Sequence, residues 1–405
     1  MKKWLFFGVF LILVCVSGFQ VHADQTSSAT RLALFKNDVV KYYENMDTKK
    51  VLVIGNKDFL RSFMDAVNKN PKYTYAVPSS NLNWNNYDFI IDSVNDENTF
   101  STIYCGYPRN HISSFISLYT EMLYDKTLEF FKKNNIKFYY VEYSWSMVNC
   151  LDNYEKAVLA GQVSPTSSEY VNKLYYDNQE SAQYMLEGAE YGKYDITNNG
   201  KHNVPVDRRG KYCNVINGKR LTTDTPTKIK NTIHIFGPCG TYCPAVTDAY
   251  TLESYLQRLI NNAMPDSLIS VDNCGVPGTD TLNDFEYMIN EKYHPGDVVI
   301  DFSLIFNRQD LLKKAISKHG FDYLIPRDLF NKPHSYGYVI VDGGGHKNHR
   351  ANEVFAKYFY SLIKKDLNEN APETPYIKYN SDNDKEDFLN NNPELKKYLC
   401  FLKKI

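Results

Sequence analysis

The residues best suited to chemistry in this 405-residue chain follow a short apolar stretch in its second half. Residues 233–236 have the composition of a buried strand, and Gly237, Pro238 and Cys239 come directly after them. An amphipathic helix pattern then covers residues 251–262. A strand that ends at glycine, followed by a nucleophilic side chain and a helix, is typical of the nucleophile turn of α/β enzymes. We therefore predict that Cys239 is a nucleophile whose thiolate is favoured by the positive end of the following helix.

Three blocks in this half of the chain resemble the conserved blocks of SGNH/GDSL-type hydrolases, in the same order. The first is residues 236–239, which puts Cys239 where that family has its serine. The second is residues 273–278, in which Gly278 matches a glycine whose amide helps to form the oxyanion hole. The third is residues 342–348. The similarity spans about residues 231–365, and the order of the blocks is more specific than any one of them.

The third block carries the remaining catalytic residues of the family. The resemblance implies that His346 is the general base and that Asp342 orients it. Asp342 lies four residues before His346 instead of three, and glycines at positions 343–345 can let the loop absorb the extra residue. A Gly-x-Asn-Asp block is not visible after the strand predicted at 297–302, and Asn307 is the nearest candidate for its oxyanion-hole residue.

The first block also departs from the family. Pro238 stands where the family has aspartate, and Cys243 stands where it has a glycine four residues after the nucleophile. The resemblance therefore implies a divergent site, with Cys239, His346 and Asp342 as catalytic residues. Its oxyanion hole would be formed by Cys239, Gly278 and Asn307.

Three functions agree with these residues. The first is a hydrolase or acyltransferase that acts on acyl esters of a small molecule or of a surface or dietary polysaccharide, without a cofactor. The second is an inactive SGNH-like binding or scaffolding protein of the cell surface. The third is a zinc site built from Cys239, Cys243, Cys274 and His346, although the spacing of these residues matches no common zinc motif.

Two further histidines compete for a role in the site. His349 is an alternative base to His346, or else a surface residue at a helix start. His234 lies inside the strand before the nucleophile turn, and a position of this kind favours a core histidine with satisfied hydrogen bonds.

The elements that position these residues alternate between strand and helix patterns, which predicts an α/β fold. Residues 24–150 read as an N-terminal Rossmann-like open sheet, with strands at 50–54, 73–77, 88–93 and 136–143 and helices at 58–68 and 112–134. Residues 231–365 read as an SGNH-hydrolase-like three-layer α/β domain with a parallel sheet. Its expected strands are 233–236, 268–271, 298–302 and 338–341, and its expected helices are 251–262, 282–292, 309–318 and 350–364.

The remaining segments are more polar. Residues 151–230 form a connector or lid, with helix patterns at 153–161 and 167–190 and a loop at 198–210. Asn217-Gly218 within residues 212–221 is the signal of a type I′ hairpin. Residues 366–405 are expected to be a polar tail with a short helix at 393–404.

The N-terminus and the composition indicate where the protein works. Residues 1–23 have the basic start, apolar run and small-residue end of a signal peptide, so we expect export and no stable membrane span after cleavage. Cleavage removes one of the eight cysteines, and the odd number that remains leaves at least one free thiol. The net charge of −1 gives no electrostatic basis for binding nucleic acid. The oligomeric state is left open.

Overall fold

The computed structural model describes residues 50–66, 71, 73–77, 86–93, 112–142, 164, 166–188, 190, 194–199, 202–303, 309–326 and 346–367. The predicted signal peptide, the helices predicted at 153–161 and 393–404, the strand at 338–341, Asp342 and Asn307 lie outside these residues. The chain divides into two compact units, one made mainly of residues up to 129 and the other mainly of the residues after them. Each unit has a sheet that contains parallel strands, so the α/β class is confirmed.

The first unit holds a four-stranded sheet in the order β2-β1-β3-β4, and every neighbouring pair is parallel. The strands are β1 (Val51–Ile54), β2 (Tyr73–Ala76), β3 (Phe89–Asp92) and β4 (Ile112–Ser114). Helix α3 (Lys57–Ala66) packs an aromatic ring on this sheet, with the Phe63 and Tyr73 centroids 5.3 Å apart. A sheet that contains the strands predicted at 50–54, 73–77 and 88–93 is therefore present, with β4 as an additional strand.

Two elements of the first unit differ from the prediction. The helix expected from residue 112 begins at Phe115, because residues 112–114 pair with β3 as strand β4. This helix, α5, ends at Lys133. Helix α12 (Gln309–His319), expected in the C-terminal domain, belongs for most of its length to the first unit. There its Lys314 ammonium lies 2.8 Å from the Glu121 carboxylate of α5.

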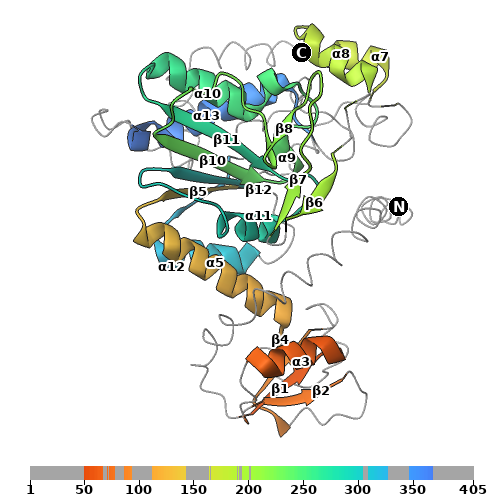
Figure 1. Ribbon diagram of the computed structural model, residues 1–405, viewed down its shortest axis with the longest axis vertical. Coiled ribbons are helices and arrows are strands. Elements are labelled where there is room, and N and C mark those ends of the chain that lie inside the picture. Colours follow the sequence, from red (N-terminus) through yellow and green to blue (C-terminus); the bar gives the residue numbers. More distant parts are fainter. Residues whose placement is uncertain are drawn as a thin grey trace, which may run out of the picture. The chain divides into compact units, whose positions relative to one another are not determined.

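The second unit contains a seven-stranded sheet in the order β13-β5-β12-β10-β11-β9-β8 (Figure 1). The long strands are β10 (Asn231–Gly237), β11 (Ile269–Gly275) and β12 (Val298–Ser303). Strand β10 lies between the other two and is parallel to both, as predicted for the strand that precedes the nucleophile. The outer members are β5 (Lys137–Glu142), β13 (Asp322–Leu324), β8 (Val215–Ile216) and β9 (Lys219–Arg220).

Strand β5 corrects the predicted assignment of residues 136–143 to the N-terminal sheet. It pairs in parallel with β12 over its whole length and with β13 on its other side. The apolar pattern of a strand indicates that both of its faces are buried, but it does not indicate which strands lie beside it. The sequence of β5 therefore could not assign this strand to one sheet or the other. β13 itself was not predicted.

The two faces of the second sheet are covered differently. Ile233 and Ile235 of β10 share one apolar core with α10 (Leu252–Ala263) and α13 (His349–Leu367). The alternate residue Phe236 meets Tyr287 of α11 (Thr281–Met288), with ring centroids 5.2 Å apart. Figure 1 shows α10 and α13 on one side of the sheet and α11 on the other. This alternation along β10 follows the two-residue period of a strand.

The connector region has more structure than predicted. The helix expected at 167–190 is two helices, α7 (Ser168–Leu174) and α8 (Gln179–Glu187), and the Asn178 side chain caps the second. The loop expected at 198–210 contains an antiparallel pair, β6 (Ile196–Asn198) and β7 (Asn203–Pro205). The β8–β9 hairpin is confirmed, with φ of 54° at Asn217 and 71° at Gly218.

None of the helices in the described part of the chain combines the length and apolarity needed to cross a membrane.

Candidate active site

The turn that carries Cys239 leaves the central strand through a tightly packed glycine. Gly237 has a φ of 149°, and a Cβ on it would lie 2.2 Å from Thr241 Oγ1 and 2.3 Å from the Phe302 carbonyl oxygen. Only glycine fits both this backbone conformation and this close approach. Cys239 then begins the one-turn helix α9 (Cys239–Tyr242) and is partly exposed. The sequence predicted that the helix at 251–262 follows Cys239 directly. In the structure α9 is the first helix after the strand, so that prediction is wrong.

The structure brings Cys239 together with Gly278. The backbone N–H of Gly278 donates a hydrogen bond to Cys239 Sγ over 3.3 Å, across 39 positions of sequence. Gly278 has a left-handed φ of 70°, in the turn that follows β11. An N–H aimed at the sulfur favours the thiolate over the thiol.

The other predicted catalytic residues are described only in part. His346 is buried and lies three residues before α13. Asn348 is the N-cap of that helix, because its side-chain oxygen accepts a hydrogen bond of 3.1 Å from Ala351 N. Because Asp342 and Asn307 lie outside the described residues, the complete triad and oxyanion hole stay a prediction.

A buried lysine that the sequence reasoning missed lies beside the nucleophile turn. Lys347 is 1% exposed, and its ammonium donates a hydrogen bond to the Gly240 carbonyl. It also lies 4.5 Å from the centre of the Phe302 ring. Burial lowers the pKa of Lys347 to about 8, and electrostatic interactions with Cys243, Glu253 and Cys239 oppose that shift. The only sequence signal for this residue is its position between His346 and Asn348.

The buried Asn273 side chain of β11 contacts both the end of the turn and a buried carboxyl group. Asn273 Nδ2 donates to Glu253 Oε2 over 2.7 Å and to the Thr241 carbonyl over 2.9 Å. Burial raises the pKa of Glu253 to about 8, although Lys347 and the hydrogen bond from Asn273 act in the opposite direction. The Asn273 amide therefore links the turn to Glu253.

Cys243, which ends α9, is not a second nucleophile. It is fully buried, and burial raises the pKa of its thiol to about 12. Its Sγ lies 3.5 Å from Asn352 Oδ1, and neither Cys239 nor Cys243 is in a disulfide. A thiol that remains protonated at neutral pH does not attack a carbonyl.

The chain after α9 is held by the buried guanidinium of Arg220. This side chain donates to the carbonyl oxygens of Tyr242, Cys243 and Val246. It also forms an ion pair of 3.1 Å with Asp248. Two phenols complete the attachment: Tyr175 donates to the Ala245 carbonyl and Tyr184 to the Pro244 carbonyl. The five consecutive backbone carbonyls of residues 242–246 thus all accept hydrogen bonds from buried side chains, which fix the position of the chain after the turn.

The two other histidines considered for a role in the site, His349 and His234, are both buried. His349 is buried beside Asp177, 2.9 Å from its carboxylate, and burial lowers its pKa to about 4. The prediction of a surface residue is therefore wrong. His234 is a buried strand residue, as predicted, but neither ring nitrogen has a hydrogen-bond partner in the described structure.

The predicted zinc set of Cys239, Cys243, Cys274 and His346 is not a ligand cluster. All four residues are described, and a different set, His234, Asp272 and Cys274, is the group whose donor atoms converge among the described residues.

No protein-family model, curated protein or solved structure matches this chain.

Proposed function

We propose that this chain is a secreted hydrolase or acyltransferase of SGNH/GDSL type in which Cys239 replaces the serine nucleophile. Its substrates are acyl esters on a small molecule or on a surface or dietary polysaccharide. The observation that carries the proposal is the hydrogen bond of 3.3 Å from Gly278 N–H to Cys239 Sγ. The resemblance to SGNH/GDSL-type hydrolases implies that these two residues, from separate blocks, are the nucleophile and a member of the oxyanion hole.

The proposed first half-reaction transfers the acyl group to sulfur. His346 takes the thiol proton, and the thiolate attacks the ester carbonyl carbon, so that a C–S bond forms and the carbonyl electron pair moves to oxygen. Donors at Cys239, Gly278 and Asn307 stabilise this oxyanion, and the loss of one such donor costs about 3–4 kcal/mol of barrier. Collapse of the intermediate breaks the C–O bond, and the alcohol leaves with the proton held by His346.

The second half-reaction regenerates the thiol. His346 removes a proton from water or from a sugar hydroxyl, and the resulting oxygen nucleophile attacks the thioester carbon. The C–S bond breaks, and the sulfur recovers the proton. Water as the acceptor gives hydrolysis, whereas a sugar hydroxyl gives acyl transfer.

Lys347 supports the thiolate in this proposal. Its charge interacts with that of Cys239, and its ammonium is held at the neighbouring Gly240 carbonyl. A buried cation beside a thiol stabilises the thiolate and lowers the thiol pKa. Lys347 is a positioning and electrostatic residue here, and His346 is the base.

The test is acylation of the reduced, full-length protein by p-nitrophenyl esters of several chain lengths. The expected result is release of p-nitrophenol, with one acyl group on the peptide that contains Cys239, detected by mass spectrometry. Cys239→Ala should abolish both signals, while Cys213→Ser, which alters a buried thiol 3.6 Å from the Tyr242 hydroxyl, should keep them.

The opposite result would favour the second function expected from the sequence. If folded, reduced protein releases no p-nitrophenol and acquires no acyl group at Cys239, a catalytically inactive SGNH-like binding or scaffolding protein becomes the better description. If Cys239→Ala remains as active as the unaltered chain, the nucleophile lies elsewhere.

A further inference from the structure

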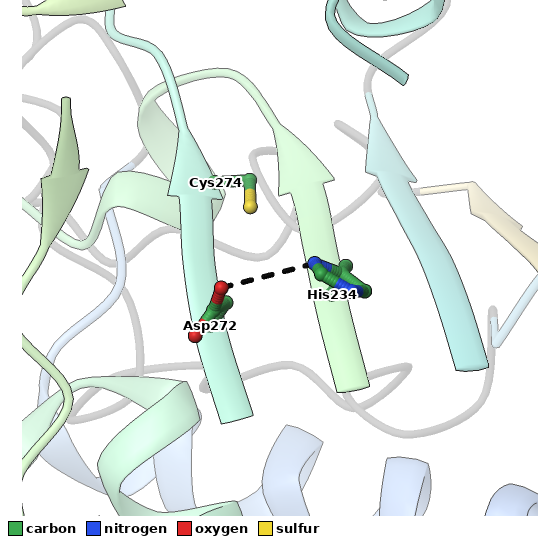
Figure 2. A group of neighbouring side chains, drawn as sticks. All are labelled: His234, Asp272 and Cys274. Atoms are coloured by element: carbon green, nitrogen blue, oxygen red, sulfur yellow. Dashed lines mark ion pairs between the residues drawn. The ribbon is translucent and has the colours of Figure 1, made fainter. Parts of the chain in front are cut away.

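Strands β10 and β11 carry three metal-ligand side chains on one face of the second sheet. His234 and Asp272 are direct partners in the parallel pair, and Cys274 lies two residues beyond Asp272. Side chains two apart on a strand share a face, so all three project from the same side (Figure 2). Their ligand atoms lie within 4.8 Å of one another.

The imidazole of His234 is the unusual member of this group. Its side chain is 95% buried, and neither ring nitrogen has a hydrogen-bond partner among the described residues. Nδ1 lies 3.8 Å from an Asp272 oxygen, which is too long for a hydrogen bond. The dashed line in Figure 2 marks this contact. A buried polar group without a partner destabilises the folded state, and a metal ion bound at this nitrogen would remove that cost.

The second nitrogen of His234 is placed as in a metal-bound histidine. Nε2 lies 3.5 Å from a carboxylate oxygen of Asp297. That carboxylate is fixed by the backbone N–H groups of Thr232, at 2.8 Å, and His294, at 2.7 Å. Histidines that ligate a metal through one nitrogen usually direct the other to a carboxylate, which sets the tautomer and orients the ring.

A cation, the Lys219 ammonium, already lies beside Asp272. The Lys219 ammonium is 2.6 Å from Asp272 and 3.1 Å from Glu291. Two carboxylates share one ammonium, so this corner of the protein is rich in negative charge. The Asp272 side chain is 30% exposed and that of Lys219 is 23% exposed, which leaves a route from solvent.

We propose that His234, Asp272 and Cys274 form a zinc-binding site that joins β10 to β11. Imidazole and thiolate are ligands that zinc prefers, whereas magnesium and calcium take oxygen ligands. Zinc–ligand bonds of about 2.0–2.3 Å require the donor atoms of a tetrahedral site to be about 3.3–3.8 Å apart, so the group must contract by about 1 Å. On binding, the Cys274 proton leaves to solvent, and the Lys219 ammonium stays with Glu291. Water takes the fourth position.

The site is independent of the proposed esterase chemistry. Cys274 lies within β11 opposite Phe236, whereas the nucleophile is in the turn beyond the end of β10. Zinc here would fix the pairing of the two strands from which the nucleophile turn and the Gly278 turn depart. The test of this site does not depend on esterase activity.

The experiment uses Co²⁺ as a spectroscopic substitute for Zn²⁺ on the chelator-treated, reduced, full-length protein. The expected result is one equivalent bound, with a thiolate-to-cobalt charge-transfer band in the near ultraviolet and the visible bands of a tetrahedral ion. Added Zn²⁺ should bleach both. Absence of a saturable charge-transfer band in the folded, reduced chain would overturn the proposal without any variant.

Single-residue variants test which side chains bind the metal ion. Cys274→Ser should remove the charge-transfer band, and His234→Gln should weaken Co²⁺ binding at least tenfold. Cys239→Ser and Cys213→Ser are matched controls in which the band should persist. Lys219→Met removes the competing cation, so we expect it to bind Co²⁺ more tightly, by about tenfold or more. A band that survives Cys274→Ser but disappears in Cys239→Ser would assign the metal to the nucleophile turn and refute the site.

Discussion

The buried guanidinium of Arg220 is the main support of the chain that follows the nucleophile turn. It donates to three backbone carbonyls and pairs with Asp248, and its side chain is fully buried. In Arg220→Met the Asp248 carboxylate becomes an unpaired buried charge. Removal of one partner from a buried ion pair typically costs about 3–5 kcal/mol. We therefore expect the free energy of unfolding to fall by about 3–5 kcal/mol.

The three carbonyls contribute to this loss, but not additively. Each buried acceptor left without a donor costs about 1–3 kcal/mol, and relaxation of the loop and entry of water reduce the sum. The double variant Arg220→Met/Asp248→Asn separates the two effects. It removes the unpaired charge while the carbonyls stay unsatisfied, so it should be more stable than Arg220→Met and less stable than the unaltered chain.

Arg258→Met is the matched control. Arg258 also forms an ion pair and stacks on a tyrosine, but its side chain is 33% exposed and that of its partner Asp224 is 51% exposed. Exposed pairs contribute at most about 1 kcal/mol. Urea unfolding followed by far-ultraviolet circular dichroism gives the free energies, and hydrogen exchange of residues 242–248 reports the loop. If Arg220→Met costs no more than Arg258→Met, the proposed support of the turn is wrong.

Three further predictions concern the turn, the buried carboxyl group and export. A Cβ at Gly275 would lie 2.3 Å from Tyr242 N, so Gly275→Ala should cost about 1–3 kcal/mol or more and slow alkylation of Cys239. Gly188→Ala, where the added atom meets open space, should leave alkylation unchanged. Because the pKa of Glu253 is raised to about 8, the folded state holds its proton between pH 4.5 and 8, where the unfolded state releases it. Stability should therefore fall as pH rises through this window, by up to about 1.4 kcal/mol per pH unit, and urea unfolding of Glu253→Gln should lack this decline. Finally, N-terminal sequencing of the exported protein should begin near Asp24, and finding Met1 there would refute cleavage.

The elements around the nucleophile could be predicted because their signals are local. A short apolar run marks β10, which is buried from Ile233 to Gly237, and an amphipathic pattern marks α10, which the Thr251 side chain caps by accepting a hydrogen bond from Ser254 N. The Asn217-Gly218 hairpin depends on two residues that tolerate positive φ. Each of these features is determined within a few residues, so the sequence alone was sufficient.

The features that were missed depend on distant contacts. Nothing within residues 136–143 indicates pairing with β12, and residues 112–114 form a strand only because β3 lies beside them. Lys347 reads as an ordinary polar residue, and only the tertiary fold buries it beside the turn. The ion pair and backbone contacts of Arg220 likewise join positions more than 20 residues apart. Local patterns cannot report such contacts, because burial of a charge is decided by the whole fold.

The most direct test of the nucleophile proposal is the pH dependence of Cys239 alkylation by iodoacetamide in folded, reduced protein. Peptide mass spectrometry would give the rate at each pH, with free cysteine treated in parallel. The Gly278 N–H and the Lys347 charge should lower the thiol pKa below about 8.5, the value for free cysteine. Lys347→Met should raise that pKa, whereas Lys357→Met, farther along α13, should not. A midpoint at or above the free-cysteine value in the unaltered chain would contradict the assignment of Cys239 as an activated nucleophile.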